Sequence, residues 1–196
     1  MPSEKHVNKR NQIINSTITL MQRVGYEETN VRTICEAANI SIGTFYHYFK
    51  DKSELLNMIL KQIDVYLEHE VAPLLTSSSD AENLRLFARG FARETTISCS
   101  FYGGVLSSPN IPLPNYGSCL DEEHNRTLYT LPRQIFLHGQ ETGEFSIQYD
   151  ASDLTDKLIT CLRGCAMDWA RRGYSYNIEN YIDSLMDIFC NAISLK

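Results

Sequence analysis

Apolar residues recur at spacings of three and four along almost the whole chain, and sustained alternation of apolar and polar positions is confined to short pieces. Spacings of three and four place side chains on one face of an α-helix, whereas alternation indicates half-buried strands. The pattern therefore predicts an all-α protein with a set of short helices first and longer helices behind them.

Four helices are expected before residue 75. The first runs from about Asn8 to Val24 and stops at Gly25, because glycine is favoured just past a helix end. Asn30 and Ser41 are side chains suited to cap the second and third helices. The second covers about 31–38, the third lies in 42–49, and the fourth begins at the capping pattern Asp51-Lys52-Ser53-Glu54 and ends before Pro73.

Longer helices are expected in the rest of the chain. Their expected ranges are about 80–99, 120–140 with Pro132 as a possible kink, 152–172 and 178–195. Three prolines in 109–114 exclude a helix there. Residues 173–177 form a link short enough to make the last two helices antiparallel neighbours. The organisation expected is one domain of short helices in 1–52 and a second helical domain in 53–196.

The composition fits a folded protein without a membrane segment. Hydrophobic residues make up 43% and charged residues 21% of the chain, which argues against disorder. No stretch reaches the roughly 18 apolar residues of a membrane span, and the first ten residues lack the apolar part of a secretion signal. A cytoplasmic location is expected, with the six scattered cysteines reduced.

Charge divides unevenly along the chain. The net charge of −6 seems unfavourable for nucleic-acid binding, but residues 1–61 hold eight Lys and Arg against six Asp and Glu, a balance of +2. Residues 62–196 hold ten against 18, a balance of −8. Any contact with DNA is therefore expected in the first third.

Two short helices joined by a tight turn, with a helix on either side, are the plan of a helix-turn-helix, here narrowed to residues 31–49. Phe45 and Phe49 lie four residues apart and are expected to bury together, which leaves Thr44, His47 and Tyr48 to point elsewhere. Gly43 costs about 1 kcal/mol relative to alanine inside a helix. We interpret it as a site of close approach, either to the DNA backbone or to a neighbouring helix.

The run VGYEETNVRTICEAANISIGTFYHYFKDKSELL resembles the signature of the TetR family of repressors. The resemblance covers about residues 10–60, with two departures: Cys35 stands where alanine is usual and Asn39 where glycine is usual. Neither threatens the fold, because cysteine is small and apolar and asparagine accepts the turn conformation. The matching positions are Gly25, Tyr26, Thr29, Ile34, Ala38, Ile40, Ser41, Gly43, Phe45, Tyr46, Tyr48, Phe49, Lys52 and Leu55.

The resemblance implies DNA-contacting roles at particular positions. Tyr46, His47 and Lys52 would bind phosphates, and Ser41, Ile42 and Thr44 would approach base edges. Tyrosine hydroxyls, lysines and helix N-termini are ordinary phosphate donors, so the chemistry agrees for the phosphate set. Arg32 would reach either a phosphate or a minor-groove edge, and Ser41 would serve either as a base contact or only as a cap.

Residues 75–196 carry no comparably specific motif. The resemblance implies a bundle that binds a small molecule and pairs with a second copy, so a homodimeric repressor released from a pseudo-palindromic operator is expected. A largely apolar or aromatic effector would bind among Phe87, Phe91, Tyr102, Tyr116, Tyr129, Phe136 and Trp169. The expected dimer interface is Leu158, Leu162, Trp169, Tyr181, Leu185, Ile188 and Phe189, with an ordinary core as the alternative for both sets.

Other chemistries have weaker support in the sequence. Glu68-His69-Glu70 and Glu122-Glu123-His124 hold metal-binding residue types, but adjacent residues diverge around a helix, so no metal or other cofactor is expected. A thiol-based redox regulator using Cys161 and Cys165 stays open as an alternative, although their apolar stripe favours burial. A small Cys or His enzyme is disfavoured because no positioned base accompanies a nucleophile.

Overall fold

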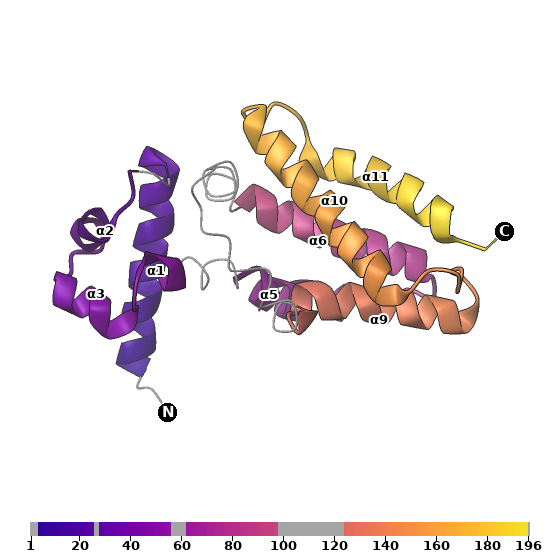
Figure 1. The fold of residues 1–196 in the computed structure, drawn as a ribbon, viewed down its shortest axis with the longest axis horizontal. Helices are drawn as coiled ribbons and strands as arrows, with labels where there is room; N and C mark the ends of the chain where they lie inside the picture. Colours follow the sequence, from indigo (N-terminus) through magenta and orange to yellow (C-terminus); the bar gives the residue numbers. More distant parts are fainter. Residues whose placement is uncertain (1–3, 26–27, 56–61, 98–123, 196) are drawn as a thin grey trace. The chain divides into compact units, whose positions relative to one another are not determined.

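The computed structural model describes residues 4–25, 28–55, 62–97 and 124–195, which form two compact units (Figure 1). We refer to the part up to residue 55 as the N-terminal unit and to the part from residue 62 as the bundle. Regular structure in the described ranges is helical throughout apart from one isolated bridge, so the prediction of an all-α fold is confirmed. The domain boundary after residue 52 stays a prediction.

The N-terminal unit contains α1 (Glu4–Val24), α2 (Val31–Ala38) and α3 (Ile42–Tyr48), followed by a helical segment at 52–55. The expected ranges hold within a residue or two, except that α1 begins four residues before Asn8. The prediction rested on apolar spacing, which does not extend into the polar residues before Asn8, and nothing in 4–7 breaks a helix. The unit has its own core, made by Ile13, Ile14, Leu20, Met21, Ile34, Cys35, Ala38, Phe45, Phe49 and Leu55.

The bundle begins with a helix that changes its winding. Helix α5 (Gln62–Tyr66) continues directly into a π-helical turn, η1 (Leu67–Val71). A 3₁₀ turn, η2 (Ala72–Leu74), follows. Pro73 lies in η2, where the chain leaves the helix as expected. Three of the predicted longer helices are present, and each begins and ends within two residues of its predicted range. They are α6 (Asp80–Ile97), α10 (Ala151–Arg171) and α11 (Ile178–Ile193). The proline-rich stretch 109–114 lies outside the described residues.

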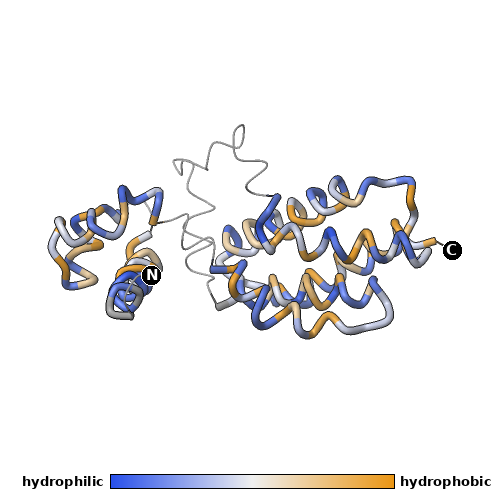
Figure 2. Tube along the Cα trace, turned by 90° about the horizontal axis from the view of Figure 1, so that it is seen from below, coloured by the Kyte–Doolittle hydropathy of each residue, from blue (hydrophilic) through white to orange (hydrophobic). Residues whose placement is uncertain are grey.

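The helices of the bundle pack through one shared apolar core. Figure 2 shows hydrophobic and hydrophilic positions following one another around each of its helices, as expected for amphipathic helices. Phe87, Phe136 and Phe145 are among its fully buried side chains. Gly139 allows the close approach of α9 to the following segment, because a Cβ at this position would lie 2.3 Å from the Phe145 ring.

The helix predicted at 120–140 is interrupted at 125–126, and the regular helix begins after this break. The helix α9 (Thr127–Thr142) has the extended residue Arg126 as its N-cap, and residues 120–123 lie outside the described residues. The Asp64 carboxylate accepts hydrogen bonds from Nε of Arg126 at 2.8 Å and from the backbone N–H of Leu128 at 3.0 Å. A carboxylate on α5 thus caps α9 in place of a local side chain. Pro132 is buried inside α9.

A ladder of ion pairs joins α6 to α11. Arg85, Arg89 and Arg93 follow one another at intervals of four on α6, and each meets an acidic residue at the same interval on the antiparallel α11. The pairs are Arg85–Asp187 at 2.9 Å, Arg89–Asp183 at 2.7 Å and Arg93–Glu179 at 3.4 Å. The matched intervals favour one register of the two helices.

Glu144 ties together segments that are distant in the sequence. Its carboxylate accepts hydrogen bonds from the Ser79 hydroxyl at 2.8 Å and from the backbone N–H groups of Asp80 at 2.6 Å and Ala81 at 3.0 Å, which cap α6. The backbone beside it pairs with the chain end, where Leu195 donates to the Glu144 carbonyl. Burial alone would raise the pKa of Glu144, but these hydrogen bonds outweigh it and lower the pKa.

We expect Glu144→Gln to lower the free energy of unfolding at pH 7 by about 1–3 kcal/mol, because hydrogen bonds to a charged acceptor are lost. A lowered pKa in the folded state stabilises the protein above the unfolded-state pKa, and this contribution disappears as the pH falls through the folded-state value. Urea unfolding at pH 7 and at about pH 3.5 measures both effects. Glu141→Gln, at an exposed position of α9, is the control. A Glu144→Gln deficit of equal size at both pH values would contradict the role of the charge.

Candidate DNA-binding surface

The turn between α2 and α3 depends on Asn39. This residue has φ 52° and ψ 56°, the left-handed conformation, and its backbone N–H bonds to the Glu36 carbonyl at 3.3 Å to close α2. Asparagine adopts this conformation at lower cost than most residues. The departure from the family's glycine at this position therefore preserves the turn, as predicted.

Side-chain caps start both short helices. The Asn30 side chain accepts hydrogen bonds from the backbone N–H groups of Arg32 at 3.0 Å and Thr33 at 3.1 Å, and the Thr33 hydroxyl accepts the Asn30 N–H at 2.9 Å. Ser41 caps α3 through a bond from the Thr44 N–H at 3.0 Å. The two predicted caps are confirmed, and together they set where each helix starts.

Burial of one face of α3 decides which face stays free. Phe45 and Phe49 are 0% and 1% exposed, with ring centroids 5.6 Å apart, and they pack in the core of the N-terminal unit. The guanidinium of Arg10 lies 5.7 Å from the centroid of the Phe49 ring. The prediction that these two rings bury together is confirmed.

Several other side chains of α3 are exposed. Ile42 is 51% exposed and Tyr46 56% exposed, and His47 is exposed beside them. Large side chains rarely stay so exposed on a short helix without a partner, although single cases are ordinary. The surface presents an apolar group, a hydroxyl and an imidazole, and we call Ile42, Tyr46 and His47 the α3 outer face.

The remaining predicted DNA contacts are Arg32, Ser41, Thr44 and Lys52. Arg32 is exposed on α2 and pairs with Glu36 at 3.2 Å, an exposed i,i+4 ion pair that water weakens. Ser41 and Thr44 bond to each other through their hydroxyls at 2.9 Å. Lys52 is half-buried at the start of the next helical segment, where Asp51 accepts the Glu54 N–H at 2.8 Å. Arg32, Ser41 and Ile42 are among the residues that line a pocket of about 320 Å³.

Gly43 has no neighbour in the chain that requires a glycine. It is exposed, and a Cβ built there would meet only the Ser41 hydroxyl oxygen, at 3.8 Å, which is ordinary contact. Close approach to a helix of the same chain is thereby excluded as its reason within the described residues. Of the two interpretations of this glycine, the approach of an outside partner is the one that stays.

His6 is a neighbour of this surface that the motif did not indicate. Its ring centroid on α1 lies 5.6 Å from that of His47 and 4.5 Å from that of Tyr48. The family signature begins after it, so no spacing rule reaches it. The only available signal was the presence of a second histidine in a modestly basic region.

The residues predicted for the effector site gather in the bundle core. Phe87, Phe91, Tyr129, Phe136 and Trp169 are all buried in the same apolar cluster, whereas Tyr102 and Tyr116 lie outside the described residues. Some polar atoms in this region have partners: Arg163 donates to the Tyr129 hydroxyl at 2.9 Å and Trp169 donates to the Tyr176 carbonyl at 2.7 Å.

Thr95, on α6, is different. It is 1% exposed, and its hydroxyl has no hydrogen-bond partner among the described residues. A buried polar group without a partner costs about 1–3 kcal/mol, so this hydroxyl is a place where a polar atom of a ligand would be stabilised.

The residues predicted for the dimer interface separate into two groups. Leu158, Leu162 and Trp169 are buried within the core of one chain, which accounts for them without a partner. Tyr181 and Ile188 are 52% and 68% exposed on α11. Leu185 and Phe189 are half-buried. We call Tyr181, Ser184, Leu185, Ile188 and Ala192 the α11 outer face; it points away from the ion-pair ladder.

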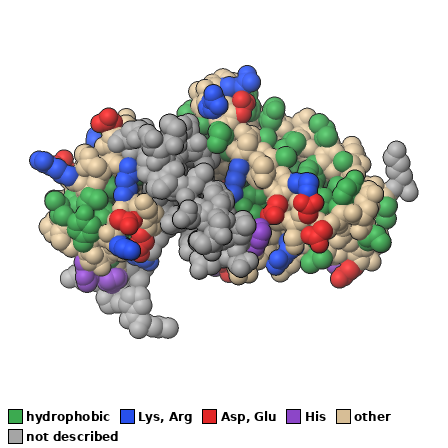
Figure 3. Space-filling model, in the orientation of Figure 1, with side chains coloured by type: hydrophobic (Ala, Val, Ile, Leu, Met, Phe, Trp, Pro, Cys, Tyr) green, Lys and Arg blue, Asp and Glu red, His purple; other side chains and the backbone are tan. Residues whose placement is uncertain are grey.

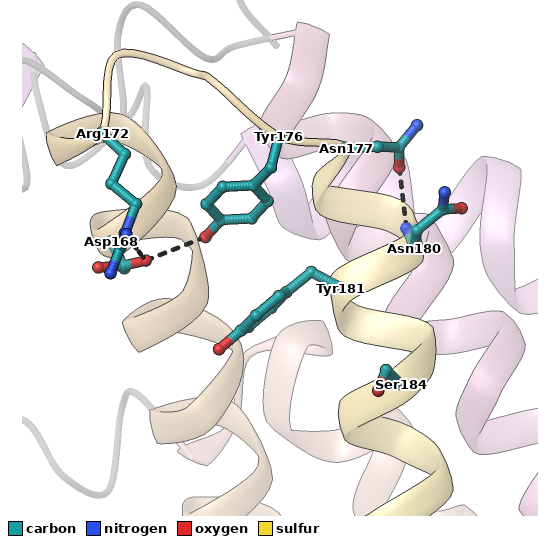
Figure 4. Close-up of a pocket in the computed structure, with 7 residues that line it drawn as sticks. All are labelled: Asp168, Arg172, Tyr176, Asn177, Asn180, Tyr181 and Ser184. Atoms are coloured by element: carbon teal, nitrogen blue, oxygen red, sulfur yellow. Dashed lines mark hydrogen bonds and ion pairs between the residues drawn. The ribbon is translucent and has the colours of Figure 1, made fainter.

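A groove of about 590 Å³ borders the α11 outer face at the loop that joins α10 to α11 (Figure 4). The Tyr176 hydroxyl donates to Asp168 at 3.3 Å, and Arg172 bonds to the same carboxylate at 2.8 Å. Burial, followed by the nearby Asp168 charge, raises the pKa of Tyr176 to about 12. The groove is lined by Asp168, Arg172, Tyr176, Asn177, Asn180, Tyr181 and Ser184.

Three of the described cysteines have a raised pKa, which makes their thiols poor nucleophiles. Burial, with the neighbouring Cys161 and Asp168, raises the pKa of Cys165 to about 11. Burial also raises the pKa of Cys190 to about 11 and that of Cys35. A raised pKa leaves little thiolate at neutral pH. Cys99 and Cys119 lie outside the described residues.

In the described ranges, no three His, Cys, Asp or Glu side chains come together in a group that could hold a metal ion. Glu68, His69 and Glu70 are exposed on the π-helical turn η1, while Glu122 and Glu123 lie outside the described residues. None of the described helices has the length and apolar content needed to cross a membrane.

Comparison with known proteins places the strongest similarity on the N-terminal unit. Residues 13–59 match the model of the bacterial regulatory proteins of the tetR family. The HTH-type transcriptional regulator BetI of Proteus mirabilis (strain HI4320) is 34% identical over 113 residues, which are 53% of this chain and 56% of that protein. The alignments with the first curated relatives span about half of those proteins.

Solved structures extend the similarity of fold over nearly the whole chain. The fatty acid degradation regulator FadR of Bacillus halodurans superposes with a TM-score of 0.78 at 17% identity, over 93% of this chain and 94% of that one. The transcriptional regulator FadR of Bacillus subtilis, solved in complex with stearoyl-CoA, has a TM-score of 0.76 at 18% identity, covering 92% and 97%. The N-terminal unit thus carries a helix-turn-helix that matches the tetR family of bacterial regulatory proteins, and the chain shares the all-helical fold of these solved regulators.

Proposed function

We propose that the chain is a homodimeric, sequence-specific DNA-binding regulator that a small molecule releases from its operator. The α3 outer face carries this proposal. Ile42, Tyr46 and His47 are held outward by the burial of Phe45 and Phe49 on the other side of a helix that is two turns long. A helix presented in this way fits the major groove of DNA. Such a regulator would act in the cytoplasm, where its operator is.

The proposed contacts are of two kinds: contacts to phosphates, which position the protein on the duplex, and contacts to base edges, which recognise the sequence. Tyr46, His47 and Lys52 would bond to phosphates, which position a protein on the duplex without reading its sequence. Ile42 and Thr44 would meet base edges, where an apolar side chain fits the thymine methyl group. Ser41 is engaged as a cap, and Arg32 would exchange Glu36 for a phosphate or a minor-groove edge. The open space around Gly43 supports close approach of the DNA backbone.

The proposed dimer uses the α11 outer face. Exposed apolar side chains at helical spacing are unusual on a surface that only meets water, and a two-fold dimer would cover them with their own counterparts. The groove beside Tyr181 would then receive side chains of the second copy. Two-fold symmetry places two α3 helices in successive major grooves about 34–36 Å apart, which requires a pseudo-palindromic operator.

The proposed effector binds in the apolar core that contains Phe91 and Tyr129. Ligand sites are mostly apolar with a few polar groups, and the unpartnered Thr95 hydroxyl is one such group. The FadR structure in complex with stearoyl-CoA supports an effector with a long apolar part. Coupling would be reciprocal, so that DNA weakens effector binding by the factor by which the effector weakens DNA binding.

The alternatives are weaker. The raised pKa of Cys165 weighs against a thiol sensor at that position. We propose no enzymatic activity, because the relatives are named as transcriptional regulators and no described cysteine or histidine is arranged as an activated nucleophile.

Selection from a random duplex library tests the proposed function directly. We expect a recovered site with two-fold symmetry and half-sites one helical turn apart. No enrichment, or a site without a two-fold element, would contradict the proposal.

Substitutions of the phosphate set should act on every sequence alike. We expect Tyr46→Phe to weaken binding roughly tenfold, because a hydrogen bond to a charged oxygen is lost. Lys52→Ala should reduce the slope of log K against log salt by about 0.9 for each half-site engaged. Tyr149→Phe and Lys157→Ala, in the bundle, are the matched controls. Affinities equal to those of the controls would refute the phosphate roles.

Gly43→Ala should have opposite effects on stability and on DNA binding. Alanine raises the free energy of unfolding by up to about 1 kcal/mol within a helix, and nothing in the chain obstructs the new methyl group. The same methyl group should weaken DNA binding by roughly tenfold, about 1.4 kcal/mol. Chemical unfolding and fluorescence anisotropy measure the two quantities. Stabilisation with unchanged affinity would show that DNA does not approach this residue.

Ile188→Arg should convert the dimer into a monomer, because it places a charge in the middle of the proposed apolar interface. Light scattering after gel filtration measures the mass, and helicity by circular dichroism checks the fold. Ile147→Arg is the control, since Ile147 is 81% exposed and is not part of the α11 outer face. A dimeric Ile188→Arg variant with unchanged DNA affinity would place the interface elsewhere.

A further inference from the structure

Two imidazoles lie side by side at the surface of the N-terminal unit (Figure 3). His6 comes from α1 and His47 from α3, with ring centroids 5.6 Å apart in an edge-to-face arrangement. His6 also packs on the Tyr48 ring at 4.5 Å, and the His47 and Tyr48 centroids are 5.1 Å apart. Helices α1 and α3 thus bring together two groups whose charge changes near neutral pH.

The charged residues nearest to this pair in the sequence are mostly cationic. On α1, Lys9 bonds to Gln12 at 3.1 Å, and Arg10 lies one turn after His6 over the Phe49 ring. Beyond α3, Lys50 is exposed and Asp51 bonds to the Glu54 N–H. Among the described side chains, neither imidazole is paired with a carboxylate.

We propose that His6 is a further phosphate-binding residue of this surface and that it acts with His47 as a pair of cations that form by taking up protons when DNA binds. The inference rests on the proposed function and extends it. His47 belongs to the α3 outer face, and the ring contact places His6 at the edge of the same surface. The duplex thereby gains a contact from α1 as well as from α3.

The physical reason is the absence of an internal counter-charge. An imidazole carries a positive charge only after it binds a second proton, and a nearby negative charge stabilises that form. Phosphate oxygens supply the missing negative charge, so binding and protonation favour each other. By linkage, affinity must fall as the pH rises through the range in which these rings titrate.

The experiment measures DNA affinity between about pH 6 and pH 8 at constant ionic strength, by anisotropy of a fluorescein-labelled duplex. The duplex carries the sequence recovered by library selection, and a mixed-sequence duplex of equal length is the second probe. For the wild type we expect affinity roughly tenfold higher at the lower pH and a salt slope steeper by about 0.9 for each imidazolium–phosphate contact. The variants are His6→Gln and His47→Gln.

Each single variant should reduce the pH dependence, and the double variant should remove most of it while still binding DNA at pH 8. His69→Gln, which changes an exposed histidine of the bundle, should behave as the wild type. A pH dependence unchanged in His6→Gln, or equally reduced in His69→Gln, would overturn the inference and leave the proposed function standing. No DNA binding by the wild type at any pH would overturn the proposed function itself.

Discussion

The proposed DNA-binding surface depends on the burial of Phe45 and Phe49 in the N-terminal unit. Once these rings are fixed in the core, the rotation of α3 is fixed as well, and Ile42, Tyr46 and His47 must point outward. The left-handed turn at Asn39 and the cap at Ser41 determine where α3 starts. The surface is therefore a consequence of packing, and substitutions in the core would move it as a whole.

The bundle is held by interactions between residues far apart in the chain. The Glu144 carboxylate caps α6, the Asp64 carboxylate caps α9, and the ion-pair ladder favours one register of α11 on α6. The ladder occupies one side of α11 and the core another, which leaves the α11 outer face uncovered. In the proposed dimer a second copy of the chain covers the exposed apolar side chains there, and this arrangement agrees with the two-fold operator proposed for the α3 helices.

Local features of the chain could be predicted from the sequence, because they depend on neighbouring residues. The helices, the caps at Asn30 and Ser41 and the buried face of α3 are of this kind. The start of α9 could not be predicted, because its cap comes from Asp64, 62 residues before Arg126. The ion-pair ladder is visible in the sequence as basic and acidic residues at intervals of four, but apolar spacing alone does not indicate it. The DNA contacts predicted from the motif include the three exposed residues of α3, whereas His6 and Thr95 became visible only in three dimensions.

The most direct test of the central claim is to map the residues that respond when DNA is added. Backbone amide chemical shifts of the isotope-labelled chain, recorded with and without the selected duplex, provide this map. The account predicts that the largest changes fall on residues 41–47 and around Lys52, with smaller changes in the helices of the bundle. Changes concentrated on α10 and α11, or spread evenly over the chain, would contradict the assignment of the α3 outer face as the DNA-binding surface.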